Sequence, residues 1–355
     1  MLHGPHAIAA RRWLKHAAIS GGLDVLGVAA RSGLGGRLSG RGAIFTLHHV
    51  RPAEDSDFAP AAHLEITPEF LDAAICSLKA MGHQPVSLLD LPAHLARGPE
   101  AGPAMVFTLD DGYRDNLQHA LPVFERHGIP FTVFVTGGFI DRTHSIWWKT
   151  AAALISRVER FDFAFDGTED SVSTRTLREK YAAYDRLHRT LGAHDQARFI
   201  EDLDRRARKA GIEPLDIVDR EVMTDADLRC LLQSPLATLG AHTISHCSLA
   251  HIDAQALEAE IGESAERVAA ITGRCPRAFA YPYGDHRAAG AREFEAARAF
   301  GFDLAVTTNA DVLRGSALKR LHALPRISLN GYYQKARHVA ALASGLPFAA
   351  RRLSA

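Results

Sequence analysis

The stretch Thr108-Leu109-Asp110-Asp111-Gly112-Tyr113 (TLDDGY) follows the apolar run 104–107 and places two carboxylates where a strand is expected to end. Adjacent strand residues point to opposite faces, so one carboxylate can face a site while its neighbour is solvated or structural. In an irregular turn, the two carboxylates instead converge on one cation or divide acid-base work between them. A strand followed by an ordinary Asp-Gly turn is the simplest interpretation of the stretch alone. The rest of the chain decides between these interpretations.

The composition is that of an ordinary globular protein. The chain has 355 residues, of which 47% are hydrophobic and 23% charged, enough for one large α/β domain with an insertion. Lys+Arg and Asp+Glu number 41 each, so no net field favours nucleic acid, and the expected partner is neutral or small. The four cysteines show no CxxC spacing, so the sequence indicates neither a zinc ribbon nor a dense disulfide framework.

The first 40 residues are expected to form a separate N-terminal helical segment. Arg11, Arg12 and Lys15 interrupt the apolar run that a signal peptide requires, so a cytoplasmic location is expected. Trp13 and the leucines that follow it can form an amphipathic helix. Such a helix either lies on a membrane surface or packs on the main domain, and packing is the simpler expectation.

Strand-like and helix-like segments alternate over residues 41–345, which we interpret as one domain. The strand-like runs end near residues 47, 109, 135, 242, 281, 308 and 329. Residues of about 145–232 are charged and helical in pattern, and we interpret them as a helical insertion. The alternation predicts a parallel sheet, either doubly wound or closed as a barrel.

Polar residues collect at the carboxyl ends of these strands. His48, Asp110, Asp111, His242 and Tyr283 each lie at or just past such an end. In barrels and open α/β sheets alike, that rim carries the active site. The sequence therefore predicts one site there.

His242 and His246 have the spacing of metal ligands, although 19 histidines make one such pair by chance unsurprising. With Asp111 they would form a set of two histidines and one carboxylate that leaves positions open. Zn²⁺ is the expected cation, and Fe, Co or Ni also suit such a site. A divalent cation there would polarise a carbonyl and activate water, so hydrolysis is the natural chemistry. Asp110 would then be free to act as the base.

Three motifs in this order, TLDDGYRDN, HTISH and FAYPYG, resemble those of the polysaccharide deacetylases with a NodB-like domain, carbohydrate esterase family 4. The resemblance runs from about Ala43 to Leu329. It implies a distorted (β/α) barrel, with Asp110 as catalytic base. It also implies a metal site made by Asp111, His242 and His246, in agreement with the reasoning from the residues.

The chain departs from the family pattern in two places. Where the family often has an arginine that orients the base, this chain has Ala280, and Arg326 is the expected substitute. For the late motif that usually supplies a general-acid histidine, the chain offers only Leu321-His322, which lies in a polar turn and not at a strand end. The run FTLHH resembles a rearranged arrangement, which implies His48 as the acid, with His49 as its competitor.

The expected function is metal-dependent removal of an acetyl group from a saccharide, most naturally the N-acetyl group of a hexosamine. Tyr283 and its backbone amide would lie beside the substrate carbonyl. Tyr113, Pro282 and Trp148 are expected to bind the acetylated saccharide. Two alternatives remain open: an O-acetyl esterase with the same machinery, and a saccharide-binding protein with a degenerate site, which the missing arginine at Ala280 would suit.

Overall fold

A curled, parallel sheet forms the centre of the protein in a computed structural model, which describes residues 5–31, 38–54, 56–163, 170–191 and 195–349. The side chains of residues 5–15 and 31 lie outside the description. The strands follow the spatial order β11 (Leu304–Val306), β10 (Ala278–Ala280), β9 (Ala237–Ala241), β6 (Phe131–Val135), β5 (Ala104–Leu109), β1 (Gly42–Leu47) and β12 (Ile327–Ser328). A short strand, β4 (Gln84–Pro85), pairs with the first residues of β5.

The two edges of this sheet meet at the segment that leads into β12. Leu324 forms a parallel bridge with Val306 of β11, while Ile327 pairs with Phe45 of β1. The Leu324 amide donates to the Ala305 carbonyl at 3.0 Å, so the contact with β11 is a true ladder bond. The barrel expected from the resemblance is confirmed, and the doubly wound alternative is excluded.

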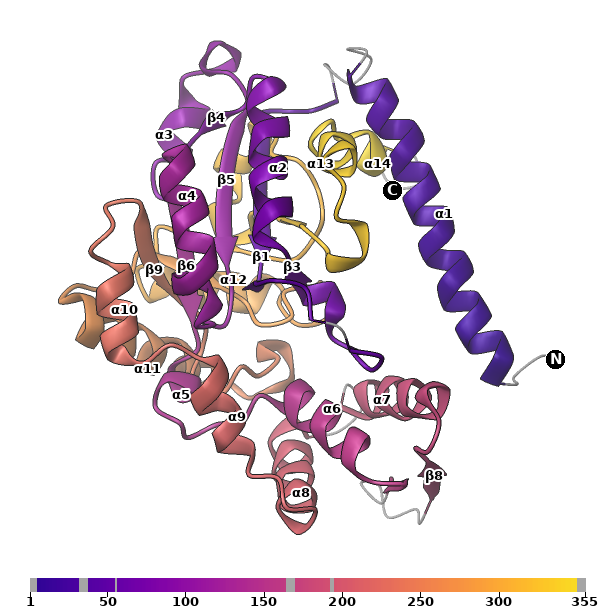
Figure 1. The fold of residues 1–355 in the computed structure, drawn as a ribbon. Coiled ribbons are helices and arrows are strands. Elements are labelled where there is room, and N and C mark those ends of the chain that lie inside the picture. The colour runs from indigo at the N-terminus through magenta and orange to yellow at the C-terminus, as the bar shows by residue number, and fades with distance from the viewer. Residues whose placement is uncertain (1–4, 32–37, 55, 164–169, 192–194, 350–355) are drawn as a thin grey trace.

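Helices cover the outside of the sheet, as Figure 1 shows for α2 and α4 in front of β5. Thr67 caps α2 by accepting from the Phe70 amide, with Pro68 in the first helical position. Asp253 caps α11 in the same way, and Gly273 ends it in the left-handed conformation. The helices of this layer are α2 (Pro68–Ala80), α4 (Leu121–His127), α5 (Gly137–Ile140), α11 (Ala254–Thr272) and α12 (Ala291–Ala299). Helix α3 (Leu91–Ala96) differs from them, because Leu91 and Leu95 belong to the same apolar cluster as Val106 on the inward face.

Side chains alternate between the two faces of the sheet, as the strand pleat requires. On β5, Phe107 points outward into the main core and lies with its ring centroid 5.4 Å from that of Phe124 in α4. Val106 belongs to a second apolar cluster on the inward face. Thr108 and Asp110 continue the inward series of Val106, so the pleat carries polar side chains into the barrel mouth.

The insertion lies beyond the carboxyl ends of the strands, at the lower end of the molecule in Figure 1. It is not wholly helical, because it also contains an antiparallel pair of strands. Its end is attached to the TLDDGY loop: Tyr113 bridges Val222, and the Met223 amide donates to the Gly112 carbonyl at 3.0 Å. Its elements are α6 (Trp147–Arg157), β7 (Arg160–Asp162), β8 (Ser171–Ser173), α7 (Leu177–Leu191), α8 (Gln196–Lys209), α9 (Pro214–Glu221) and α10 (Asp225–Leu231).

The N-terminal helix α1 (Pro5–Arg31) packs along α13 (Ala336–Ala343), near α14 (Leu346–Ala349), on one side of the molecule (Figure 1). Asp24 binds Arg337 and His338, with His338 Nε2 2.5 Å from Asp24 Oδ1. Gly27 lies against the Arg337 backbone, where a larger residue would collide with the carbonyl. The side chain of Trp13 lies outside the described residues. Within the described chain, no helix combines the length and apolar character needed to cross a membrane.

Candidate metal centre

The guanidinium of Arg326 and the carboxylate of Asp110 form a bidentate ion pair in the barrel mouth. Arg326 Nη1 donates to Asp110 Oδ1 at 2.7 Å, and Nη2 donates to Oδ2 at 2.8 Å. Nη1 also donates to Thr108 Oγ1 at 3.1 Å, and Nε donates to the Thr307 carbonyl at 2.9 Å. Arg326 is 0% exposed and Asp110 3%. Charges this deeply buried are tolerated because each is paired and hydrogen-bonded.

The surroundings of Asp110 favour its ionised form. Burial, the largest single effect, would raise the pKa of this carboxyl, but the charge and hydrogen bonds of Arg326 lead several effects that together hold the pKa below its ordinary value. Thr46 Oγ1 is a further donor, 3.4 Å from Asp110 Oδ2. An ionised carboxylate in a fixed orientation is what a general base requires.

Asp111 leaves the strand alternation and turns toward the two histidines. Its φ is 72°, in the left-handed region that Asp tolerates better than most residues. Asp111 Oδ1 lies 3.6 Å from Nε2 of His242 and 3.3 Å from Nε2 of His246. With regular strand angles, the Asp111 side chain would point to the face opposite Asp110. The turn therefore brings both carboxylates to one mouth but into different surroundings.

The ring of His242 is oriented by the backbone. Its Nδ1 lies 2.7 Å from the Ala280 carbonyl, to which it donates its proton, so the lone pair of Nε2 faces Asp111. Burial lowers the pKa of His242 to about 4, which keeps the imidazole neutral. A neutral imidazole with one nitrogen fixed by a carbonyl is the usual form of a metal-binding histidine.

The HTISH segment is a loop that Glu260 of α11 holds in place. Glu260 Oε2 accepts from the amides of Ile244 at 2.8 Å and Ser245 at 3.0 Å. Thr243 Oγ1 accepts from the His246 amide at 3.0 Å, and both of these residues have positive φ, at 63° and 56°. Such strain persists where the surrounding structure fixes it, often at functional sites. Sequence reasoning missed Glu260, which lies in mid-helix with no motif around it.

The donor set fits a divalent cation. Neither oxygen of Asp111 nor the Nδ1 of His246 has a hydrogen-bond partner among the described residues, although all three atoms are buried. Unpaired buried polar atoms are costly, and a cation between the three side chains would satisfy the carboxylate. Ligand atoms about 2.0–2.1 Å from a tetrahedral zinc ion lie about 3.4 Å apart. The separations of 3.6 and 3.3 Å from Asp111 Oδ1 match that spacing.

A second group of potential ligands, Asp72, Cys76 and His127, lies partly exposed outside the barrel. Its carboxylate is already engaged, because Asp72 Oδ1 lies 2.9 Å from both Arg126 Nη1 and His127 Nε2. A cation there would have to displace a guanidinium. We therefore expect the buried trio of Asp111, His242 and His246 to be the stronger site.

His48 lies in the barrel mouth and His49 behind it. The Nε2 of His48 is 4.0 Å from Asp110 Oδ2, and the His48 side chain is 20% exposed. The His49 ring is completely buried, and its Nδ1 lies 2.5 Å from Asp115 Oδ2. Of the two candidates, only His48 is placed to donate a proton to a substrate, and that role stays a prediction.

Aromatic rings surround His246. The ring centroids of Phe139, Trp148 and Tyr283 lie 5.8, 5.0 and 5.1 Å from that of His246. Tyr283 has a φ of 59°, and its hydroxyl accepts from Trp147 Nε1 at 3.0 Å. The insertion, which supplies both tryptophans, therefore helps to exclude water from one side of the candidate centre.

Tyr113, one of the residues expected to bind substrate, has no exposed surface in the structure. Tyr113 is 0% exposed and stacks on His49 with ring centroids 3.5 Å apart, and Pro282 is also buried. A side chain with no accessible surface cannot contact a saccharide directly. Packing behind the TLDDGY loop is the role that this geometry supports for Tyr113.

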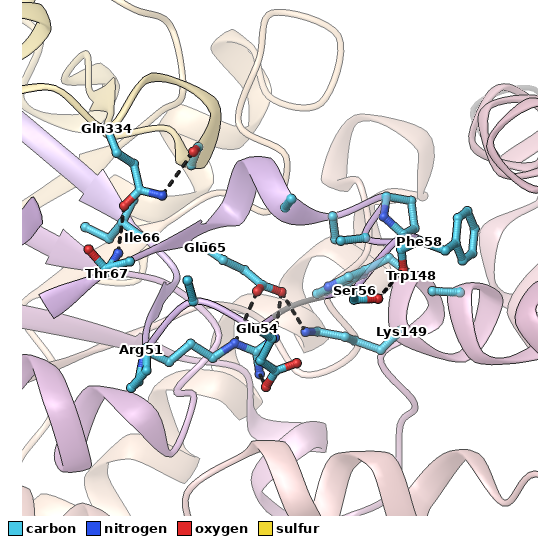
Figure 2. Close-up of a pocket in the computed structure, with 18 residues that line it drawn as sticks. Arg51, Glu54, Ser56, Phe58, Glu65, Ile66, Thr67, Trp148, Lys149 and Gln334 are labelled. Atoms are coloured by element: carbon cyan, nitrogen blue, oxygen red, sulfur yellow. Dashed lines mark hydrogen bonds and ion pairs between the residues drawn. The ribbon is translucent and has the colours of Figure 1, made fainter. Parts of the chain in front are cut away.

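A pocket of about 280 Å³ opens beside Trp148, between the loop after His49 and helix α6 (Figure 2). The loop ends at β3 (Glu65–Ile66), which pairs in parallel with β2 (His49–Val50). Glu65 lies on the pocket wall and binds both Arg51, at 2.7 Å, and Lys149, at 3.2 Å. The pocket combines charged groups with the apolar surfaces of Phe58 and Trp148, a composition that suits a sugar ring.

The candidate site lies in a part of the chain that matches a known protein family. The sequence model of the family described as polysaccharide deacetylase matches residues 97–166 and 216–304. The gap between the two matched parts falls within the insertion. The matched parts include Asp110, Asp111, His242 and His246. A search of curated proteins gives no significant match.

Solved structures share the fold at low sequence identity. The Streptococcus pyogenes deacetylase PplD, solved in complex with acetate, matches with a TM-score of 0.54 and 16% identity, over 81% of this chain and 92% of that one. IcaB from Ammonifex degensii matches with a TM-score of 0.52 and 19% identity, over 86% and 98%. A putative polysaccharide deacetylase from Bacillus anthracis matches with a TM-score of 0.51 and 14% identity, over 85% and 68%.

We predict that the amount of bound metal distinguishes variants of Asp111 from variants of Asp110. His242→Ala, His246→Ala and Asp111→Asn should each lose most bound Zn²⁺, because a three-ligand site that lacks one ligand holds its cation far more weakly. Asp110→Asn should retain it, because that carboxylate faces Arg326. The measurement is zinc content by mass spectrometry on the folded fraction from size exclusion. Equal zinc loss in Asp110→Asn and Asp111→Asn would contradict the division between them.

Proposed function

The chain belongs to the polysaccharide deacetylase family, and on that premise we propose that it hydrolyses the N-acetyl groups of hexosamine units in a saccharide. The observation that carries the proposal is the separation of two neighbouring carboxylates. Asp111 faces His242 and His246, whereas Asp110 is held by Arg326. One motif thus offers a cation ligand and an oriented base side by side, which is the minimum that amide hydrolysis with water requires.

A divalent cation held by Asp111, His242 and His246, with Zn²⁺ as the first choice, would polarise the acetyl carbonyl and lower the pKa of water. Asp110 would accept the proton of the attacking water, because its carboxylate is ionised and fixed by Arg326. His48, whose Nε2 lies 4.0 Å from Asp110 Oδ2, would donate a proton to the amine nitrogen as the C–N bond breaks. The Tyr283 amide is the candidate donor to the carbonyl oxygen.

The saccharide is proposed to extend from the metal centre into the pocket of Figure 2. Trp148 connects the two, because it approaches His246 and also lines the pocket. Sugar rings present apolar faces and polar edges, which the aromatic and charged walls would accommodate. The insertion would then shape one wall of the binding groove through α6.

We predict that acetate release depends on both the metal and Asp110. The purified chain, loaded with Zn²⁺, should release acetate from a tetramer of N-acetylglucosamine, and chelation should abolish the release. Asp110→Asn should lower turnover by about 10²–10⁴-fold at equal zinc content, the usual contribution of a general base. Acetate is measured by a coupled enzymatic assay. Release that survives both chelation and Asp110→Asn would exclude this site as the source.

Arg326→Lys should lower turnover at least tenfold while zinc content stays unchanged. A lysine keeps the charge but cannot bind both oxygens of Asp110 and also reach Thr108 and Thr307. Because the side chain is buried, the acceptors left unpaired should also cost about 1–3 kcal/mol of stability. Turnover and thermal unfolding are measured together. A variant with wild-type turnover would show that Asp110 does not need the guanidinium.

A larger side chain in the pocket tests whether the saccharide binds there. Ala152 lies on its wall, so Ala152→Phe should raise the KM for the tetramer about tenfold, equivalent to about 1.4 kcal/mol of binding. Acetate release from a monosaccharide substrate should change little. Ala153→Phe is the matched control, because Ala153 is half-buried on the same helix but does not line the pocket. Equal effects of the two variants would place the saccharide elsewhere. Trp148→Ala is less suitable, because a side chain 6% exposed also supports the fold.

A further inference from the structure

A second histidine–aspartate pair lies directly behind His48 and plays no part in the site described above. His49 Nδ1 lies 2.5 Å from Asp115 Oδ2. Both residues are buried, with His49 0% exposed and Asp115 8%. His49 begins β2, directly after His48, and Asp115 lies in the loop after β5. These two segments carry the proposed acid and base. Their contact therefore joins these segments below the surface.

Asp115 and Asn116 hold the backbone on both sides of His48. Asp115 Oδ1 accepts from the Val50 amide at 3.1 Å. Asn116 Nδ2 donates to the His48 carbonyl at 2.8 Å and to Asp115 Oδ1 at 3.0 Å. Together with the contact to His49, these bonds fix three consecutive residues of one segment against two consecutive residues of the other. The rotation of the backbone at His48 is thereby restricted.

The local backbone conformation places the Asn116 side chain for this contact. Asn116 begins a π-helix, Asn116–Ala120, a rare conformation that is frequent at functional sites. Its side chain is completely buried and reaches the carbonyl of His48, between β1 and β2. An ordinary surface turn would leave both polar side chains in water, whereas here they replace water as partners of the strand end.

His49 itself is not placed to donate a proton to the substrate. Its ring stacks on Tyr113 and is covered, and its Nε2 is buried without a hydrogen-bond partner among the described residues. His48, next in the chain, points to the opposite side, toward Asp110. The pleat of the strand end thus divides the two histidines into an inner anchor and an outer group.

We propose that Asp115, Asn116 and His49 position His48 for proton donation to the leaving amine. The inference rests on the proposed function, in which the amide C–N bond breaks, water supplies the oxygen of acetate, Asp110 takes one proton and His48 gives one to the nitrogen. The three are positioning residues that act through the backbone. They matter only for substrates whose leaving group needs a proton.

The test compares two substrates, of which only one has a leaving group that must be protonated. A tetramer of N-acetylglucosamine releases an amine, which must be protonated. The ester 4-nitrophenyl acetate releases a phenolate, which leaves without a proton at neutral pH. Asp115→Asn and Asn116→Asp are nearly isosteric with the native residues. Each should lower kcat for the tetramer at least tenfold, with KM and zinc content unchanged, and change ester hydrolysis less than twofold.

Asp253→Asn is the matched control. Like Asp115, Asp253 accepts a hydrogen bond from a backbone amide, but it caps α11, away from the site. Both activities should therefore be unchanged. Equal losses on both substrates in Asp115→Asn, at wild-type zinc content, would show a general structural role and overturn the inference. So would wild-type turnover of the tetramer by both Asp115→Asn and Asn116→Asp.

A second readout needs only the tetramer. His48→Gln should lower kcat, and Asp115→Asn added to it should cause no further loss, because both changes remove the same proton donation. Fully additive losses would contradict the inference. A wild-type chain that releases no acetate from any acetylated sugar would instead refute the proposed function, so the two failures are distinguishable.

Discussion

The site depends on the burial of one ion pair, between Arg326 and Asp110. Two charges removed from water cost several kcal/mol each unless they are paired and fully hydrogen-bonded, and here every guanidinium nitrogen has an acceptor. Arg326 lies on the segment where the two edges of the curled sheet meet, so the closed sheet places its guanidinium against Asp110. With Asp110 held in this way, the carboxylate of Asp111 is left for the histidines.

Much of this arrangement follows from local rules that can be applied to the sequence. Strand alternation places Asp110 on the inward face, and it also lets Arg326 face the barrel mouth. Thr67 and Asp253 are of residue types that favour the start of a helix, and α2 and α11 begin directly after them. Polar residues at the carboxyl ends of parallel strands share one rim whatever the connections between them. The assembly of the candidate centre can therefore be predicted from the sequence, whereas the chemical roles of its residues stay predictions.

The rest depends on contacts between segments far apart in the chain. Glu260 is an ordinary acidic residue of a helix until the HTISH loop folds onto it. The partnership of His49 with Asp115 joins two strand ends that no motif connects. Tyr113 is an aromatic residue that was expected to bind substrate, yet the end of the insertion covers it. The strand pair inside the insertion was also missed, because strands as short as β7 and β8 leave little periodicity to detect.

Anomalous X-ray scattering from zinc-soaked crystals, recorded above and below the zinc absorption edge, tests the central claim most directly. The account predicts a strong peak bounded by Asp111, His242 and His246, at about 2.0–2.2 Å from one atom of each. Asp110 should remain bound to Arg326, outside the coordination sphere of the ion. A peak coordinated by Asp110 in place of Asp111, or zinc bound only elsewhere on the chain, would contradict the account.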